Sequence, residues 1–251
     1  GDDTVAQPLK GKVLVEVFSG DSSKQGARLS ELWERLGGVA VRYDLLESPS
    51  HFLQDEVFWT EQRRKPADLY WRAVPCTHLS RANTTGGHGR TTEQPYGDET
   101  VPAVREANAV VRLFRARLMG LLPLAEHVVE NPQFSRQWEL DELLPLMSVE
   151  GCHLLRVDYC TLGMPYQKPT LLATTIPQLL GVAGVCPHKG AHERVLEGCS
   201  CVKKAERHPW PLVLCVAQAV IQHFQKLQKT TRDAARQEVA REAKKVYKKE
   251  S

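Results

Sequence analysis

Cys76 stands where a reactive cysteine would be useful. It lies in the stretch VPCTHLS, residues 74–80, directly after a strand predicted at residues 68–74, and Pro75 restrains the backbone before it. A thiolate at a strand end can attack a substrate, and nearby helix amides or cations would lower the pKa of its thiol. A lone cysteine is more often a small buried hydrophobe, so its role depends on what surrounds it.

Glu130 is the candidate partner acid. It ends a strand predicted at residues 126–129 and is followed by Asn131 and Pro132. A carboxylic acid held near N3 of a pyrimidine can protonate or stabilise the ring while a nucleophile adds to C6. A surface carboxylate that precedes a loop is the alternative. Chemical groups at several strand ends are typical of a site that those strands assemble together.

Two further strand ends carry residues typical of nucleotide-type sites. A glycine after the first predicted strand, residues 12–18, would let the backbone approach a ligand, and the following helix offers its N-terminal amides. Asp44 ends the second predicted strand, residues 39–43, where an acid commonly accepts hydrogen bonds from ribose hydroxyls. A turn or cap role is the alternative for both. The first of these loops contains Phe18, Ser19, Gly20 and Asp21.

These loops require a sheet that gathers the strand ends at one edge. Strands and helices alternate over the first 175 residues, which predicts an α/β fold, a mostly parallel sheet with helices on both faces. In such sheets, ligands bind at the C-terminal ends of the strands. We expect a main domain over residues 1–175, a small insertion over 176–207, and a closing helix with a basic tail over 208–251.

Later elements complete this predicted sheet. Residues 103–122 have the pattern of a long helix, and Ser135 can cap another helix that runs to about Met147. Residues 152–158 and 169–175 are predicted to form a pair of strands separated by a turn.

Four motifs in this order resemble those of the cytosine-C5 methyltransferase family, which has the Rossmann-like class I S-adenosylmethionine-dependent fold. Residues 18–20, FSG, look like its phenylalanine-containing cofactor loop, and residues 75–80, PCTHLS, look like its Pro-Cys-x-x-x-Ser nucleophile loop. Residues 130–131 match its catalytic Glu-Asn. Residues 163–168, GMPYQK, resemble its Gly-x-Pro-Gln-x-Arg turn, with Lys168 where arginine is usual.

The resemblance implies methyl transfer to cytosine in DNA through a covalent adduct. Cys76 would add to C6 of the base, with Glu130 at N3 and the exocyclic amine, and C5 would take a methyl group from S-adenosylmethionine. Loss of the C5 proton would then release the cysteine. The base must leave its stack to reach such a pocket, and a glycine-rich loop at residues 83–100 would close over it.

The resemblance also implies roles for the other motif residues. Lys168 would be the third catalytic residue beside Cys76 and Glu130. The cofactor would contact Phe18, Ser19, Gly20, Asp21, Asp44 and Pro75. The substrate would contact Ser80, Asn131 and Gln167.

Two alternatives stay open for the function. The same chemistry could act on RNA, because this fold branch includes tRNA cytosine methyltransferases whose recognition regions are short, as the region after Thr175 is here. A catalytically inactive relative could instead be a scaffold that binds nucleic acid or a partner methyltransferase. Such a scaffold has no chemical need of Cys76 or Glu130.

Cysteine and histidine residues cluster after the main domain. Zinc requires four soft or borderline ligands in a tetrahedral array, and a small loop-rich segment often needs such a staple. Buried cysteines and surface histidines are the alternative, and we expect Cys160 and Cys215 to be core residues. The candidate metal ligands are Cys186, His188, His192, Cys199 and Cys201.

Composition and charge are those of a globular protein that is not strongly basic. Of the 251 residues, 42% are hydrophobic and 25% are charged, and the net charge of +3 does not by itself indicate a nucleic-acid binder. The last stretch, residues 226–251, is rich in Lys and Arg, which predicts contacts to phosphates or a protein partner, or else a solvated helix. Seven cysteines without a disulfide framework indicate an intracellular compartment, nuclear in a eukaryote and otherwise cytoplasmic. No apolar stretch is long enough to cross a membrane.

Overall fold

A six-stranded sheet forms the centre of the molecule, with the strand order β2-β1-β3-β4-β6-β5. The structure is a computed structural model that describes residues 7–18, 28–43, 56–74, 76, 79, 89–122, 124–188, 192 and 208–247, with side chains as far as residue 231. The strands are β1 Val13–Val17, β2 Val39–Tyr43, β3 Leu69–Ala73, β4 Glu126–Pro132, β5 His153–Asp158 and β6 Pro169–Thr174.

The sheet is parallel except at one strand. β1 pairs in parallel with β2 and β3, and β3 with β4. β6 runs antiparallel to both of its neighbours, β4 and β5, so the strand pair expected near the end of the main domain is confirmed. This mostly parallel sheet with helices on both faces is the Rossmann-like α/β fold that the sequence predicts.

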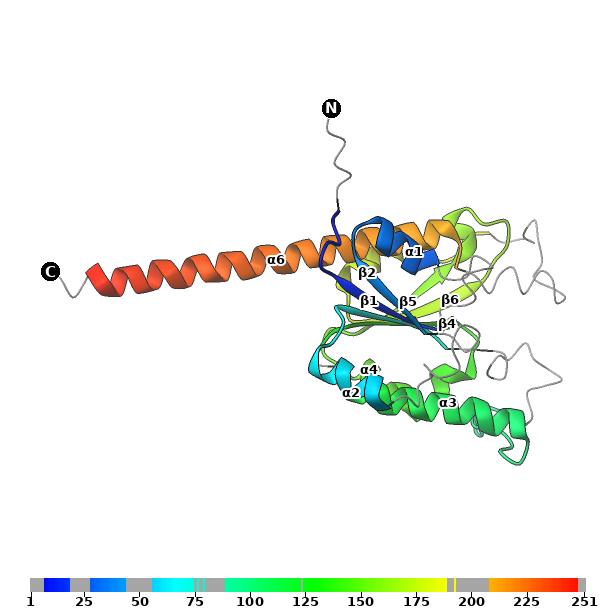
Figure 1. Cartoon of the computed structure of the whole chain (residues 1–251). Coiled ribbons are helices and arrows are strands. Elements are labelled where there is room, and N and C mark those ends of the chain that lie inside the picture. The colour runs from blue at the N-terminus through cyan, green and yellow to red at the C-terminus, as the bar shows by residue number, and fades with distance from the viewer. Residues whose placement is uncertain are drawn as a thin grey trace.

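Helices cover the two faces of the sheet (Figure 1). One face packs against α1 and α6, and the other against α2, α3 and α4. Because side chains alternate along a strand, Leu69 and Trp71 of β3 join the core under α1 and α6, whereas Tyr70 joins the core on the opposite face. The helices are α1 Arg28–Arg35, α2 Glu56–Arg64, α3 Pro102–Met119, α4 Leu144–Met147 and α6 Trp210–Tyr247.

The C-terminal helix returns to the sheet, as the sequence predicts. The apolar side of α6, including Leu212, Val216 and Val220, is buried in the same core as α1. Trp33 of α1 meets this helix: its ring lies edge-on to Phe224, with the ring centroids 6.4 Å apart. The indole Nε1 of Trp33 also donates a hydrogen bond to the carbonyl of Lys12, at 3.2 Å, just before β1. No helix in the described ranges has the length and apolar character of a membrane span.

The single helix expected from Ser135 to about Met147 is wrong. This segment instead forms the 3₁₀ helices η3 (Arg136–Glu139) and η4 (Asp141–Leu143), followed by the short α4. Ser135 does act as a cap, because its hydroxyl accepts a hydrogen bond from Gln137 N at 3.2 Å. The backbone of Leu140 is extended (φ −89°, ψ 139°), which divides η3 from η4, and Pro145 has no N–H to bond the carbonyl of Asp141.

Candidate active site and a Cys/His group

The carboxyl ends of β1, β3 and β4 lie along one edge of the sheet. The order of the strands reverses at β1, because β2 lies on one side of it and β3 on the other. Ligands of open α/β sheets bind beyond the strand ends at such a reversal. Phe18 follows β1 and Cys76 follows β3, so the predicted cofactor loop and the predicted nucleophile loop leave the sheet at this point.

Glu130 lies beside the strand end that precedes Cys76. It pairs in register with Ala73, the last residue of β3, and its side chain is 5% exposed. The strand was expected to end at residue 129, but β4 continues to Pro132 because β6 pairs with its last residues. Glu130 is therefore a buried acid within a strand rather than a surface carboxylate before a loop, and Cys76 beyond β3 is half-buried.

The carboxylate of Glu130 has one oxygen that the described residues leave without a hydrogen bond. Oε1 of Glu130 is buried and accepts no hydrogen bond among the described residues, and Nζ of Lys168 lies 3.9 Å from it. Buried polar atoms in folded proteins are nearly always hydrogen-bonded. Among the described residues, this oxygen therefore keeps an unused capacity to accept a hydrogen bond.

Lys168 joins the acid and the cysteine in one group. Burial acts to lower the pKa of Lys168, but Tyr159, Glu130 and Cys76 outweigh this effect and raise the pKa above its ordinary value. Its Nζ lies 5.1 Å from the centroid of the Tyr159 ring, and burial raises the pKa of Tyr159 to about 12. A charged ammonium therefore lies near the carboxylate of Glu130, and the charge of Cys76 also acts on it.

Asn131 of β4 is bonded to Val74, just after the end of β3. Its side chain is fully buried, and its Nδ2 donates to the carbonyl of Val74 at 2.7 Å and to Oε1 of Gln137 at 2.8 Å. Val74, two residues before Cys76, is therefore tied to the residue next to Glu130. In this structure the Asn131 amide links Val74 to Gln137.

Gln167 also bonds within the chain. Its Nε2 donates to Oδ2 of Asp158 at 3.2 Å, at the end of β5. Burial acts to raise the pKa of Asp158, but hydrogen bonds from Arg156, Cys186 N and Gln167 outweigh it and lower the pKa. Contacts of Asn131 and Gln167 to a substrate stay predictions.

His208 was not among the predicted site residues, yet it lies beside the group. Its Nε2 accepts a hydrogen bond from Nε1 of Trp71 at 3.1 Å, so a neutral ring carries its proton on Nδ1. That Nδ1 is buried and has no partner among the described residues. Burial lowers the pKa of His208, while the charge of Glu130 acts to raise it and that of Lys168 to lower it. The only sequence signal was its place at the start of the closing helix.

The end of β1 carries two unusual features. Phe18 has a φ of 63°, a left-handed conformation that costs a residue with a Cβ about 1–3 kcal/mol and is frequent at functional sites. Glu16 is buried in β1, where its Oε2 accepts hydrogen bonds from the backbone N of Ser30, at 3.0 Å, and from the Ser30 hydroxyl. Burial raises the pKa of Glu16 to about 7. The sequence signal for it is an acid within the apolar run VLVEV.

Several predicted site residues lie outside the described residues, together with part of the glycine-rich loop at residues 83–100. They are Ser19, Gly20, Asp21, Asp44, Pro75, Ser80, Cys199 and Cys201. Of the predicted catalytic residues, Cys76, Glu130 and Lys168 are described, and they lie in one group.

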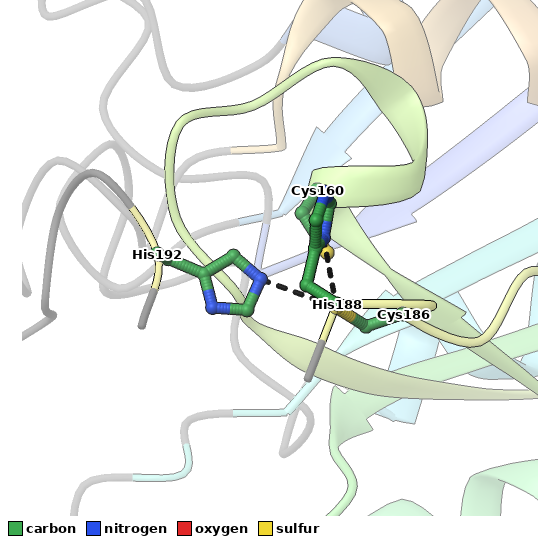
Figure 2. Close-up of side chains that lie close together, drawn as sticks. All are labelled: Cys160, Cys186, His188 and His192. Carbon is green, nitrogen blue, oxygen red and sulfur yellow. Dashed lines mark hydrogen bonds between the residues drawn. The ribbon is translucent and has the colours of Figure 1, made fainter. Parts of the chain in front are cut away.

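A second group of side chains lies near the end of β5 (Figure 2). Potential metal-ligand atoms of Cys160, Cys186, His188 and His192 all lie within 4.8 Å of one another. The expectation that Cys160 is a core residue is wrong: it is half-buried in the 3₁₀ helix η5 (Tyr159–Leu162) and faces the predicted ligands.

Comparisons with known proteins give one kind of match. No protein-family model and no curated protein matches the chain. Sixteen chains of known structure match it, and one of these is a crystal structure of the Dnmt2 methyltransferase of S. pombe. The match has 14% sequence identity and a TM-score of 0.33, and covers 73% of this chain and 57% of that one.

Proposed function

We propose that this chain transfers a methyl group from S-adenosylmethionine to C5 of cytosine in DNA, with Cys76 as the nucleophile. The observation that carries the proposal is the buried Oε1 of Glu130, which lacks a hydrogen bond among the described residues and lies 3.9 Å from Nζ of Lys168. Glu130 also pairs with Ala73, at the end of the strand that precedes Cys76. Such an oxygen could accept a hydrogen bond from the exocyclic amine of a cytosine, or from N3 once N3 is protonated.

Each side chain of the group has a role in this reaction. The Cys76 thiolate forms a bond to C6, while Glu130 holds the N3 edge and stabilises the electron density that enters the ring. The activated C5 then takes the methyl group, the C5 proton passes to a base, and elimination of the thiolate restores the C5–C6 double bond. The Lys168 ammonium supports the anionic forms of its neighbours, because a fixed charge in a buried site stabilises developing charge strongly.

S-Adenosylmethionine would lie at the reversal of strand order. It supplies a methyl group activated by its sulfonium centre. The sharp turn at Phe18 and the hydrogen bond from Phe18 N to the carbonyl of Tyr43, at 2.6 Å, hold together the strand ends from which the predicted cofactor residues follow. Phe18, Ser19, Gly20, Asp21 and Asp44 follow these two strand ends, and the remaining predicted cofactor residue, Pro75, follows β3. His208 Nδ1 would offer a further donor to a ligand atom at this edge.

Transfer of labelled methyl groups to a mixed pool of DNA and RNA tests the proposal. We expect label in DNA as 5-methylcytosine, and we expect Cys76→Ser to abolish transfer while S-adenosylmethionine still binds. Cys152→Ser is the matched control, because Cys152 is half-buried and lies outside the group. Label that stays unchanged in Cys76→Ser would refute the assigned nucleophile.

A covalent trap adds a second readout. In the presence of S-adenosylmethionine, DNA with 5-fluorocytosine should form a stable adduct with the wild-type chain, because after methyl transfer the fluorine at C5 cannot leave as a proton does. Digestion and mass spectrometry should locate the adduct on Cys76. An adduct at another cysteine would overturn the mechanism.

The other predicted functions are outcomes of the same assay. Label found in RNA alone would replace DNA by RNA as the substrate. Nucleic-acid binding that is unaffected by Cys76→Ser, with no transfer to either polymer, would favour the scaffold. The basic stretch at residues 226–251 is proposed to contact nucleic acid or a protein partner, and its removal should weaken that binding more at low salt than at high salt.

A further inference from the structure

We propose that Cys160, Cys186, His188 and His192 bind one structural zinc ion. Two thiolates and two imidazoles form a common ligand set for zinc, and four protein ligands close the coordination sphere, as structural sites require. Thiolate ligands also argue against magnesium and calcium, which prefer oxygen. This inference is independent of the proposed methyl transfer.

The distances between the ligand atoms fit such an ion. Sγ of Cys186 lies 3.2 Å from Nδ1 of His188 and 3.2 Å from Nε2 of His192. With zinc–sulfur bonds of about 2.3 Å and zinc–nitrogen bonds of about 2.0–2.1 Å, tetrahedral geometry separates S from N by roughly 3.5 Å. These two separations are a few tenths of an ångström below that value, and all four ligand atoms lie within 4.8 Å of one another.

The ligands come from two segments that the fold already brings together. Cys160 lies in η5, directly after β5, and Cys186 and His188 follow the 3₁₀ helix η6 (Pro177–Val182). Gly184 forms a parallel bridge to Val157 of β5. The two segments approach so closely that a Cβ at Gly184 would lie 2.6 Å from Oγ1 of Thr161. The backbone thus places Cys186 beside Cys160 without the metal.

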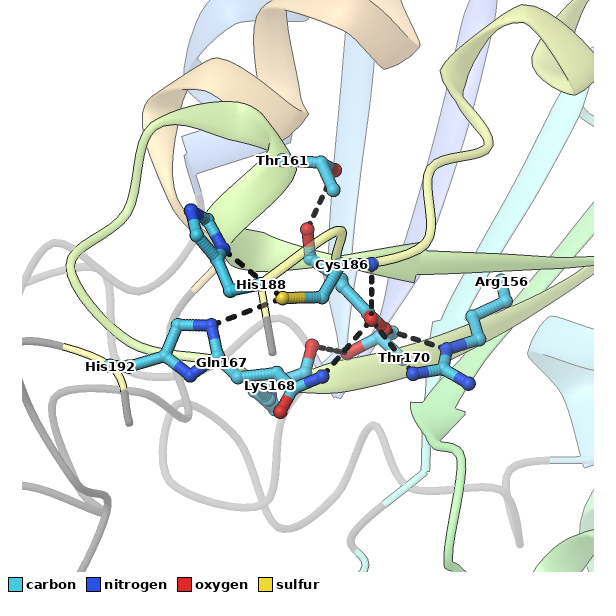
Figure 3. Close-up of polar contacts among 9 residues, drawn as sticks. Arg156, Thr161, Gln167, Lys168, Thr170, Cys186, His188 and His192 are labelled. Atoms are coloured by element: carbon cyan, nitrogen blue, oxygen red, sulfur yellow. Dashed lines mark hydrogen bonds and ion pairs between the residues drawn. The ribbon is translucent and has the colours of Figure 1, made fainter. Parts of the chain in front are cut away.

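The ion would hold the segment after η6 against the turn that carries Lys168. Figure 3 shows the contacts that link the two. Cys186 N donates to Oδ2 of Asp158 at 2.8 Å, and Gln167 donates to the same oxygen. Tyr159 N also bonds the carbonyl of Lys168 at 3.3 Å. Cys160, one of the proposed zinc ligands, directly follows Tyr159 in the chain, and the Tyr159 ring lies near the Lys168 ammonium.

Metal analysis of the purified full chain is the first test. We expect about one zinc per chain and a lower midpoint of thermal unfolding after removal by a chelator. Cys160→Ser should lower zinc affinity by more than roughly tenfold, because it removes a ligand. Cys215→Ser, a half-buried cysteine of α6 outside the group, should keep the zinc.

Alkylation of the wild-type chain tests the ligands even if Cys160→Ser does not fold. Zinc should protect Cys160 and Cys186 from alkylation, and a chelator should expose both to it, as mass spectrometry of peptides would show. Cobalt in place of zinc should give the visible bands of a tetrahedral ion with two thiolates.

Three results would overturn the proposal. A chain that contains no zinc and binds none when zinc is added would refute the site. Zinc that depends on Cys199 or Cys201 and not on Cys160 would refute the ligand set. A disulfide between Cys160 and Cys186 in the purified protein, without zinc, would replace the metal by a covalent link.

Discussion

Replacement of Glu16 by glutamine should change how the stability of the protein depends on pH. Glu16 is buried in β1, and burial raises its pKa from 4.5 to about 7, although the hydrogen bonds from Ser30 act to lower it. The folded protein therefore holds this proton more tightly than the unfolded chain does. Stability from this group is fully present below pH 4.5 and is lost as the pH rises through the folded pKa of about 7.

The size of the effect follows from the difference between the two pKa values. The shift from 4.5 to about 7 corresponds to about 3 kcal/mol between the fully protonated and fully ionised limits. Between pH 5 and pH 8 the expected loss in the free energy of unfolding is about 2.5 kcal/mol, since at pH 5 some of the loss has already occurred. Glu16→Gln keeps an oxygen that can accept both hydrogen bonds from Ser30 and does not titrate.

Urea denaturation of wild type and Glu16→Gln at pH 5, 6, 7 and 8 measures this difference. The free energy of unfolding of the variant, relative to wild type, should rise by about 2.5 kcal/mol across this range. Glu61→Gln, the same change at an exposed position of α2, should leave the wild-type pH dependence unaltered. Parallel pH profiles of wild type and Glu16→Gln would refute the assignment of a buried, protonated Glu16.

Three further variants test the site and the closing helix. Lys168→Met should lower methyl transfer about 100-fold with little effect on folding, and Lys168→Arg should restore most of the activity, because it keeps a cation beside Glu130. Steady-state kinetics would measure both variants. Equal rates for Lys168→Met and wild type would contradict the role of the charge. Asn131→Ala should lower the free energy of unfolding by about 2–3 kcal/mol and also slow methyl transfer, because the Val74 carbonyl loses its buried donor. An unchanged rate of transfer would show that the Asn131–Val74 hydrogen bond does not position Cys76. Trp33→Ala should lower the free energy of unfolding, measured with denaturant, by about 3–5 kcal/mol because it leaves a cavity under α6, and Trp33→Phe should lower it less. Similar losses for the two variants would show that the indole N–H, rather than the ring volume, provides the stability.

Much of the sheet could be predicted from the sequence, because period and turn residues mark the strands. The run KVLVEVF and the paired strands near residues 152–175 have apolar patterns that few other structures would satisfy. The segment after Ser135 could not be predicted in the same way. Its apolar residues have helical spacing, but the backbone is extended at Leu140, Pro145 lacks an N–H, and tertiary packing decides where the turns form.

The residues of the candidate site also differ in how far the sequence alone predicts them. Cys76, Glu130 and Lys168 follow from motifs, since local spacing and chain order carry them. His208 and Cys160 depend on contacts between segments far apart in the chain, such as the bond from Trp71 to His208, and one sequence gives no signal of such pairs. Glu16 was visible as a charge in an apolar strand, but its consequence depends on how deeply it is buried.

The reversed strand β6 also bears on how the chain is made. β6 forms hydrogen bonds with β4 on one side and β5 on the other, so during synthesis β4 has an unpaired edge until residues 169–174 have emerged. Unpaired edges are prone to join the strands of other molecules, and contacts distant in the sequence form late. The strand that contains Glu130 would therefore be the last part of the parallel layer to be enclosed, and a nascent chain halted before residue 169 should aggregate through it.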